Sequence, residues 1–190
     1  MRNVCGLVAG LAAGMLAMQG AWAQPYLGVG VASLSLDSQY ASIDGRSGTG
    51  ITLYGGYEFV PTWSMELSVT AATGIDTGPT VNIFYPADSA EYSVLRFGVR
   101  KSLWTLGERR WTPWVAVGVA YHYVNWDTFY YQLDGTGVSL GGGVDVALAP
   151  SWRLRLQAMR HRFSARDTYG EGPFSTRSNE LSASAMYVFR

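Results

Sequence analysis

The sequence predicts an all-β protein, in which eight antiparallel strands run up and down and close into a transmembrane barrel. Two observations carry this prediction. Apolar and polar side chains alternate along one segment after another, which is the pattern of a strand with one apolar and one polar face. The connections between these segments alternate in length, short and then long, as they do in barrels that cross a membrane.

The clearest pair of strands lies in residues 137–163, GVSLGGGVDVALAPSWRLRLQAMRHRF. In the first strand the apolar face carries Val138, Leu140, Val144, Val146 and Leu148. The opposite face carries Ser139, Gly141, Gly143, Asp145 and Ala147. Residues 149–151 make the turn. In the second strand Trp152, Leu154 and Leu156 share a face, and Arg153, Arg155 and Gln157 oppose them.

Six further strands follow the same rule, at about residues 26–36, 48–60, 64–73, 91–101, 113–124 and from residue 179 onward. Short turns follow the second, fourth and sixth strands. Long connections follow the first, third, fifth and seventh, at residues 37–47, 74–90, 125–136 and 164–178. The phase of the first strand is ambiguous. Leu27, Val29 and Val31 fall on one face of it, whereas Leu34 and Leu36 fall on the other.

The first 23 residues are expected to be a cleaved signal peptide that is not part of the fold. Arg2 supplies a positive charge, residues 4–18 are apolar, and residues 21–23 (AWA) match an A-x-A cleavage site. The apolar run is shorter than the roughly 20 residues of a membrane-spanning helix, so an uncleaved anchor is the less favoured interpretation. We therefore expect one mature domain at residues 24–190.

The composition argues against several classes of function. The single cysteine, Cys5, lies in the leader, so we expect no disulfide, thiol nucleophile or cysteine-based metal site in the mature chain. Without Arg2 the chain has 13 basic and 14 acidic residues, which argues against a nucleic-acid partner. Lys101 is the only lysine, and arginine is the cation that suits fixed pairs with carboxylates. No spacing of side chains predicts a metal or cofactor site.

Alternation alone does not separate a barrel in lipid from a soluble barrel with its apolar residues inside. The polar face of this chain is rich in small residues, and the interior of a narrow barrel has room only for side chains. The same face carries charges of both signs, which must pair once enclosed, because an unpaired buried charge costs several kcal/mol. We predict a charged network in the lumen, made of Glu58, Glu66, Arg96, Arg100, Asp145, Arg153 and Arg155.

Tryptophans gather at or beside the short turns, namely Trp63, Trp104, Trp111, Trp114 and Trp152. This clustering predicts one aromatic girdle at a membrane interface. The alternative is a set of ordinary core aromatics, which would have no reason to collect at turns of one parity. The apolar face is therefore predicted to meet lipid.

The chain resembles the small outer-membrane β-barrels typified by the transmembrane domain of outer-membrane protein A and by related adhesin-like barrels. The residues that carry the resemblance are 53–59 (LYGGYEF), 63–67 (WSMEL), 113–121 (PWVAVGVAY), 143–146 (GVDV) and 152–156 (WRLRL). It covers essentially the whole mature chain, and the order of the motifs is more specific than any one of them. The resemblance implies an integral protein of the outer membrane of Gram-negative bacteria. It also implies that the β-barrel assembly machinery reads Tyr187 and Phe189 in the last strand, although Arg190 follows them.

The function expected from this resemblance is structural, or surface recognition through the four long connections, without catalysis and with a plugged lumen. A narrow pore of low conductance is an alternative. Outer-membrane lipid and lipopolysaccharide are the expected partners. Arg160, Arg162 and Arg166 cluster where the seventh strand meets its outer loop, and their forked donors suit lipopolysaccharide phosphates. Solvated loop charges are the simpler interpretation of this cluster.

The two histidines of the chain leave an enzymatic alternative open. By alternation His122 and His161 both point into the lumen, with Asp145 on the strand between them and Ser139 or Ser164 as nucleophile. Some eight-stranded barrels deacylate lipid A, but their His-x-Ser signature is absent here. Ser164 follows His161 by three residues, which places it on the opposite face of the strand. The simpler interpretation is a pair of histidines that are hydrogen-bonded within the lumen.

Overall fold

The computed structural model describes residues 24–38, 43–76, 89–104, 109–126, 131–167 and 172–189, and all its regular elements are strands. The eight strands are β1 (Gln24–Ser38), β2 (Ile43–Val60), β3 (Trp63–Asp76), β4 (Ser89–Ser102), β5 (Trp111–Trp126), β6 (Tyr131–Ala147), β7 (Trp152–Asp167) and β8 (Phe174–Val188). Within these ranges there is no helix with the length and apolar character that crossing a bilayer requires. The expected signal peptide, residues 1–23, lies outside the described residues.

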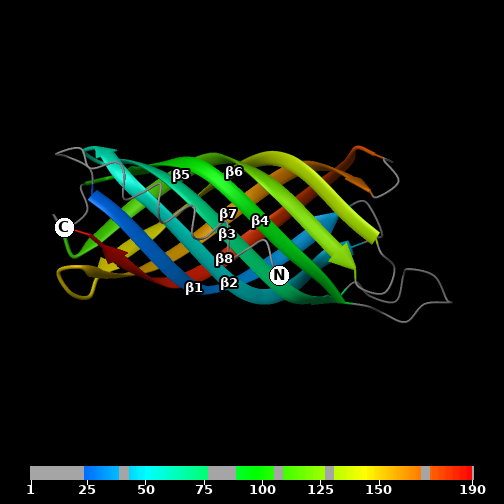
Figure 1. Ribbon diagram of the computed structural model, residues 1–190, viewed down its shortest axis with the longest axis horizontal. Coiled ribbons are helices and arrows are strands. Elements are labelled where there is room, and N and C mark those ends of the chain that lie inside the picture. Colours follow the sequence, from blue (N-terminus) through cyan, green and yellow to red (C-terminus); the bar gives the residue numbers. More distant parts are fainter. Residues whose placement is uncertain are drawn as a thin grey trace.

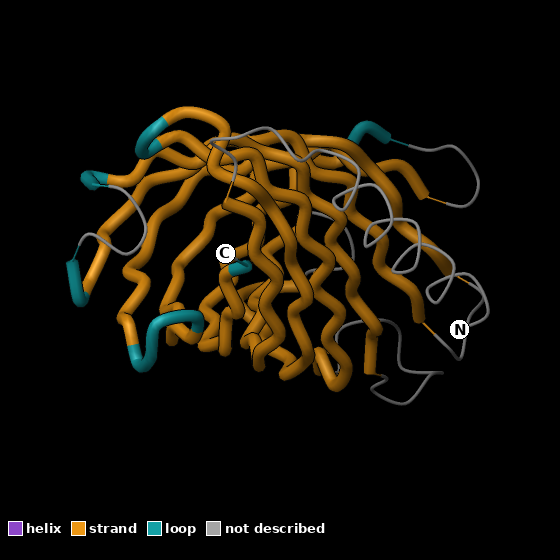
Figure 2. Tube along the Cα trace, turned by 60° about the vertical axis from the view of Figure 1, so that its left-hand side comes forward, coloured by secondary structure: helices purple, strands orange, loops and turns teal. Residues whose placement is uncertain are grey.

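The strands form one closed antiparallel barrel in the order β1 to β8, and β8 pairs with β1 (Figures 1 and 2). Strands that follow each other in the chain pair with each other, so the topology is up and down. This confirms the predicted fold class. Closure leaves no sheet edge unpaired, which is the condition for a sheet to lie in lipid. The start of β1 and the end of β8 lie together at one end of the barrel, on the left in Figure 1, and we call it the proximal end. The opposite end is the distal end.

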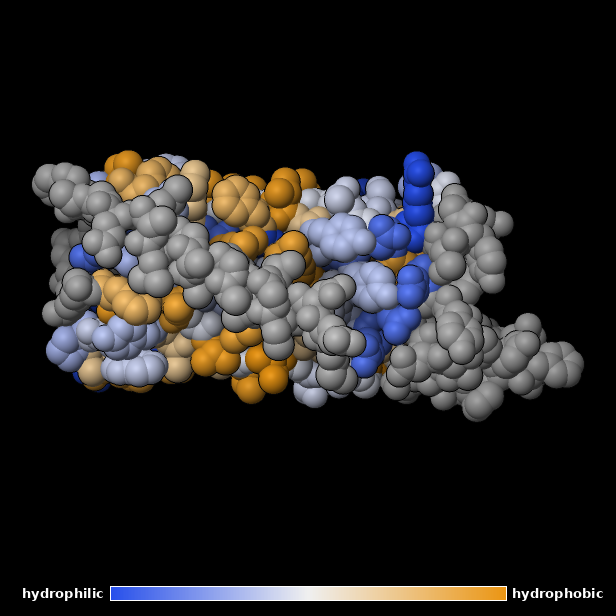
Figure 3. Space-filling model, in the orientation of Figure 1, coloured by the Kyte–Doolittle hydropathy of each residue, from blue (hydrophilic) through white to orange (hydrophobic). Residues whose placement is uncertain are grey.

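The two faces of the wall differ as the alternation predicts. Large apolar side chains point outward and stay exposed, for example Val31, Val117 and Leu140 at 67%, 59% and 66% of their surface. Inward positions are buried, and most of them are polar or charged. Figure 3 shows apolar residues over the proximal and middle parts of the visible face and hydrophilic ones toward the distal end. The fold is therefore inside out relative to a soluble barrel.

The ambiguous phase of β1 has a simple explanation. The strand keeps one phase throughout, so Leu27, Val29 and Val31 point outward, whereas Leu34 and Leu36 point inward and are fully buried. The two leucines belong to an apolar cluster that fills the distal part of the lumen. The apolar pattern thus changes face where the interior changes from polar to apolar.

The long connections were predicted too long. β1 extends to Ser38 and β2 begins at Ile43, so most of residues 37–47 is strand. β6 begins at Tyr131 and β8 at Phe174, so much of 125–136 and 164–178 is strand as well. The outward residues of these extensions are polar, whereas several inward ones, such as Leu36, Leu133 and Ala165, are apolar. The alternation is therefore inverted relative to the lipid-facing part of the strands. Of residues 74–90, the segment 77–88 lies outside the described residues.

Candidate functional site

The inward side chains near the proximal end form an ion-pair network around Arg155. Its guanidinium donates to both carboxylate oxygens of Asp145, with Nε–Oδ1 and Nη2–Oδ2 distances of 2.8 and 3.2 Å. It also donates to Glu66 through Nη1. These three side chains come from β7, β6 and β3, so the contacts cross the lumen. Arg155 therefore joins opposite walls of the barrel.

Two further arginines complete the network. Arg100 donates to Asp145, with an Nη1–Oδ2 distance of 2.7 Å, and Arg96 donates to Glu66 through Nη2. The structure thus brings together Glu66, Arg96, Arg100, Asp145 and Arg155 from the predicted set. The remaining two residues, Glu58 and Arg153, are also buried, and Glu58 accepts a hydrogen bond from the backbone N–H of Thr62 at 2.9 Å. All seven predicted residues therefore point into the lumen.

Aromatic rings surround the buried cations. The guanidinium of Arg155 lies 4.3 Å from the ring centre of Tyr54 and 5.1 Å from that of Trp114. Tyr26 donates to Glu66 at 3.1 Å, and Trp114 donates to Asp145 at 3.2 Å. Such contacts stabilise cations that are withdrawn from water. Small inward residues make room for the rings, because a β-carbon at Gly28 would lie 2.1 Å from the ring of Tyr54.

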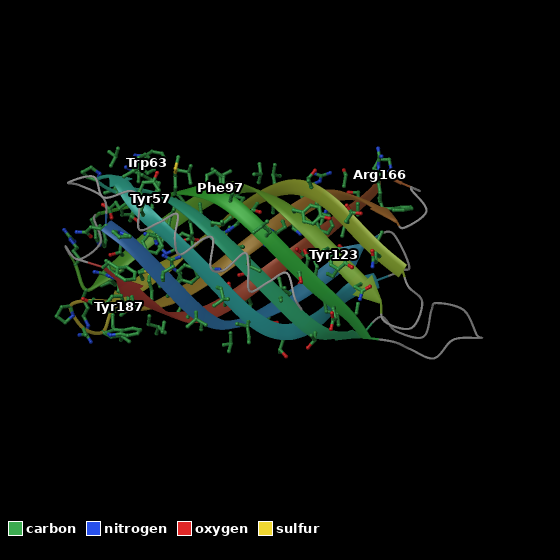
Figure 4. The ribbon with its side chains drawn as sticks, in the orientation of Figure 1. Tyr57, Trp63, Phe97, Tyr123, Arg166 and Tyr187 are labelled. Atoms are coloured by element: carbon green, nitrogen blue, oxygen red, sulfur yellow. The ribbon has the colours of Figure 1, made fainter. Side chains whose placement is uncertain are left out.

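The assignment of Trp114 to the outer girdle is therefore wrong. Its position beside a short turn suggested an interface residue, but its even-numbered place on β5 directs it inward, where it is 4% exposed. Trp63, Trp111 and Trp152 do lie exposed at the proximal end, and Trp104 packs edge-on against Trp111 with ring centres 5.5 Å apart. Figure 4 shows Trp63 and Tyr187 at this end of the barrel.

A second polar layer surrounds Glu180, a buried carboxylate that the predicted network omitted. Gln157 donates to Glu180 at 2.8 Å, and the hydroxyl of Thr70 donates to it at 3.3 Å. Alternation along β8 places Glu180 on the inner face. The pattern that predicted Glu66 as a lumen residue could therefore have predicted Glu180 as well. Thr70, Gln157 and Glu180 come from β3, β7 and β8, which continue the cross-lumen contacts toward the distal end.

The histidines form the next layer. His161 Nδ1 lies 2.8 Å from Ser139 Oγ, and His161 Nε2 lies 3.7 Å from a carboxylate oxygen of Glu180. His122 Nδ1 lies 2.7 Å from the hydroxyl of Tyr92, and the ring of His122 stacks on Phe163 with centres 3.8 Å apart. The two histidine rings meet edge to face at 5.3 Å. Both are fully buried.

Two residues of the enzymatic alternative lie elsewhere. Asp145 binds Arg100 and Arg155, six residues along β6 from Ser139, which corresponds to about 20 Å of strand. Ser164 is exposed on the outer face. The group that the structure assembles is instead Ser139, His161 and Glu180. Within the described residues, no three metal-ligating side chains lie close enough together to hold an ion.

An apolar cluster lies in the distal part of the lumen. It contains Leu34, Leu36, Ala72, Ile75, Ala90, Tyr92, Val94, Ala120, Val124, Leu133, Phe163 and Ala165. The inward residues of β7 give the order of the layers along the barrel: Arg155, then Gln157, then His161, then Phe163. From the proximal to the distal end, the lumen thus contains an ionic layer, a polar layer, a histidine layer and an apolar layer.

Among the described side chains, four exposed arginines lie on the outer wall near the distal end: Arg160, Arg162, Arg166 and Arg177. We call them the outer arginine patch. Three of them were predicted, and Arg177 was missed because it lay within an expected loop. Arg162 on β7 stands directly opposite Arg177 on β8, and Arg166 stands opposite Asp134 on β6. Figure 4 shows Arg166 at the distal end, away from Trp63.

Known structures share this architecture. The Neisserial surface protein A is 16% identical, with a TM-score of 0.62 over 87% of this chain and 97% of that one. OprG from Pseudomonas aeruginosa is 15% identical, with a TM-score of 0.60 over 90% and 99%. Ail of Yersinia pestis, in complex with the heparin analogue sucrose octasulfate, is 12% identical, with a TM-score of 0.58 over 88% and 99%. At these identities the likeness concerns the fold.

The comparison of sequences identifies the family. No curated protein matches the chain closely in sequence. Residues 4–189, nearly the whole chain, match the model of the outer membrane protein beta-barrel domain. The matched range includes every strand of the barrel. The chain therefore belongs to the outer membrane protein β-barrel domain family, and its location is the bacterial outer membrane.

Proposed function

We propose that the protein is a non-conducting barrel with a structural or surface-recognition role, exerted by its distal strand ends, loops and outer arginine patch. The observation that carries this proposal is the filling of the lumen. Four acidic side chains (Glu58, Glu66, Asp145 and Glu180) and four arginines (Arg96, Arg100, Arg153 and Arg155) are buried inside the described part of the barrel. Their charges balance, and the apolar cluster lies above them. An ion would have to displace both layers to pass.

The distal end is the part of the molecule available to the outside of the cell. Barrels of this kind have short turns toward the periplasm and longer loops toward the exterior. A surface ligand would therefore meet residues within 37–47, 74–90, 125–136 and 164–178. The complex of Ail with a heparin analogue supports recognition of polyanions by a barrel of this fold. In this chain the outer arginine patch has the chemistry for lipopolysaccharide phosphates.

The proximal end of β8 suits recognition during assembly. Tyr187 and Phe189 point outward, are 38% exposed each, and pack edge to face with ring centres 5.0 Å apart. Trp152 packs against Tyr187 at 5.2 Å. We propose that the β-barrel assembly machinery binds this aromatic end.

Single-channel recording in planar bilayers tests the plugged lumen. The wild-type protein is expected to show no steady ion conductance. Replacement of Arg100 by alanine removes a buried cation and exposes part of Asp145 to water, so the variant is expected to conduct transiently or to lose stability. Steady conductance of the wild-type protein would instead support a narrow pore. Unchanged conductance and thermal stability in the Arg100→Ala variant would contradict a plugging role for the network.

A lipid A hydrolase is a second candidate, favoured by the short Ser139–His161 contact and the nearby Glu180. We expect no such activity, because Ser139 is 1% exposed and lies between the polar layer and the apolar cluster. Lipid A from cells that overproduce the protein is therefore expected to have an unchanged mass spectrum. Loss of an acyl chain, reversed by His161→Ala and by Ser139→Ala, would establish the enzyme and overturn this proposal.

A further inference from the structure

The outer wall carries a hollow of about 990 Å³ that crosses five strands, from β6 through β7, β8 and β1 to β2. Outward positions in this region are held by small residues, among them Ser33, Gly142, Ala158 and Ala183. Larger apolar side chains stand beside them, including Val31 and Leu181, which are 67% and 62% exposed. The wall is therefore indented at the level where it meets hydrocarbon.

The hollow lies directly below part of the outer arginine patch. On β7 the outward residue after Ala158 is Arg160, and the next is Arg162. On β8, Ala158 faces Leu181, Arg160 faces Asn179 and Arg162 faces Arg177. The rise from Ala158 to Arg162 is about 13 Å along the strand, because each residue advances about 3.3 Å. Apolar and cationic surfaces are thus continuous on the same two strands.

Of the arginines above the hollow, Arg160 and Arg162 have no acidic neighbour on either adjoining strand, whereas Arg177 faces Asp37 on β1. Arg162 stands between Arg177 on β8 and Val138 on β6, and Arg160 stands between Asn179 and Leu140. Like charges directly opposite each other on a sheet destabilise it. An anion held between Arg162 and Arg177 would remove this repulsion and accept charge-assisted hydrogen bonds from both guanidinium groups.

We infer that the hollow and the arginines above it form one lipid site, which binds the phosphorylated, multiply acylated glycolipid of the outer leaflet, lipid A. A phosphate lies among Arg160, Arg162 and Arg177, and an acyl chain occupies the hollow. This inference rests on the outer arginine patch of the proposed function and adds the apolar half of the site. Lipid A fits this site because it carries phosphates at the level of the patch and acyl chains that run down the wall.

Native mass spectrometry of the detergent-solubilised barrel, titrated with diphosphoryl lipid A, measures this binding. Ala158→Phe combined with Ala183→Phe fills the hollow, and Val99→Phe on β4 is the control on a strand that does not line it. The filled variant is expected to bind lipid A about tenfold more weakly, and the control within about twofold of wild type. Heat-modified mobility on gels verifies that each variant is folded.

A second pair of variants tests the charged half. Arg162→Gln with Arg177→Gln is expected to weaken lipid A binding by at least about tenfold, since each arginine–phosphate contact is charge-assisted. Arg109→Gln with Arg110→Gln, at the proximal end, is the matched control. Inorganic phosphate and phosphatidylglycerol serve as further probes, and both are expected to bind more weakly than lipid A.

The outcomes separate this inference from the proposed function. If the filled variant binds lipid A as wild type does while the arginine variant binds it more weakly, the hollow is not part of the site and the inference fails. The proposed role of the outer arginine patch is then still supported. If neither variant changes binding, both fail. If wild type is a dimer that the filled variant converts to a monomer, a second copy occupies the hollow and the inference is overturned.

Discussion

Replacement of Arg155 by alanine is expected to destabilise the barrel by about 3–5 kcal/mol, the cost of leaving buried charges without their partner. Arg155 is fully buried and donates to both Asp145 and Glu66. Its removal leaves Asp145 paired with Arg100 and Glu66 paired with Arg96 in the described part of the lumen. The loss also removes the cation that packs against Tyr54 and Trp114.

Urea unfolding of the barrel in lipid vesicles measures this change in the free energy of unfolding. Arg160→Ala is the matched control, because Arg160 lies on the same strand but points outward and is exposed. Its loss is expected to change stability by less than about 1 kcal/mol. An Arg155→Ala variant as stable as the Arg160→Ala variant would contradict the role of the ionic layer in joining the walls.

Replacement of Val117 by arginine is expected to cost about 2–4 kcal/mol, the range for a cation on the lipid face near the membrane midplane. Val117 lies near the middle of β5, points outward and is 59% exposed. On a barrel in water the same substitution would be nearly neutral. The measurement is the free energy of unfolding in lipid vesicles.

The control for this substitution is Thr136→Arg, an outward and exposed position on the distal extension of β6. There a cation is near the interface, so the expected cost is about 0–1 kcal/mol. Equal costs at Val117 and Thr136 would mean that the outward face has no depth-dependent contact with hydrocarbon. The lipid-facing assignment of the wall would then have to be withdrawn.

Side chains follow the alternation of their strand even where their identity looked contradictory. Leu34 and Leu36 seemed to break the phase of their strand, yet both obey it and lie inside. Trp114 was assigned to the interface from its nearness to a turn, although its phase on the strand indicated the lumen. The side-chain period of a strand is two whatever the residue type. In this fold the position of a residue along its strand therefore predicts whether it points inward more reliably than its residue type does.

The ends of the strands were harder to predict. The distal extensions carry polar residues on their outer face, as Arg160, Arg162 and Arg166 do on β7. A lipid-facing strand is recognised from sequence by apolar residues on its outer face, and polar residues replace these once the outer face leaves the hydrocarbon. Arg177 was missed for this reason, and its place opposite Arg162 became visible only in the register.

The sequence by itself determined the class of fold, the direction of side chains on strands whose phase was clear, and the presence of inward charges of both signs. Only the tertiary structure decided which charges meet. Arg155 and Glu66 are 89 residues apart in the chain and bind across the lumen, and Glu180 joins Gln157, Thr70 and His161 from separate strands. The reason is geometric: alternation depends on neighbours along one strand, whereas partners across a barrel depend on the register of all eight strands at once.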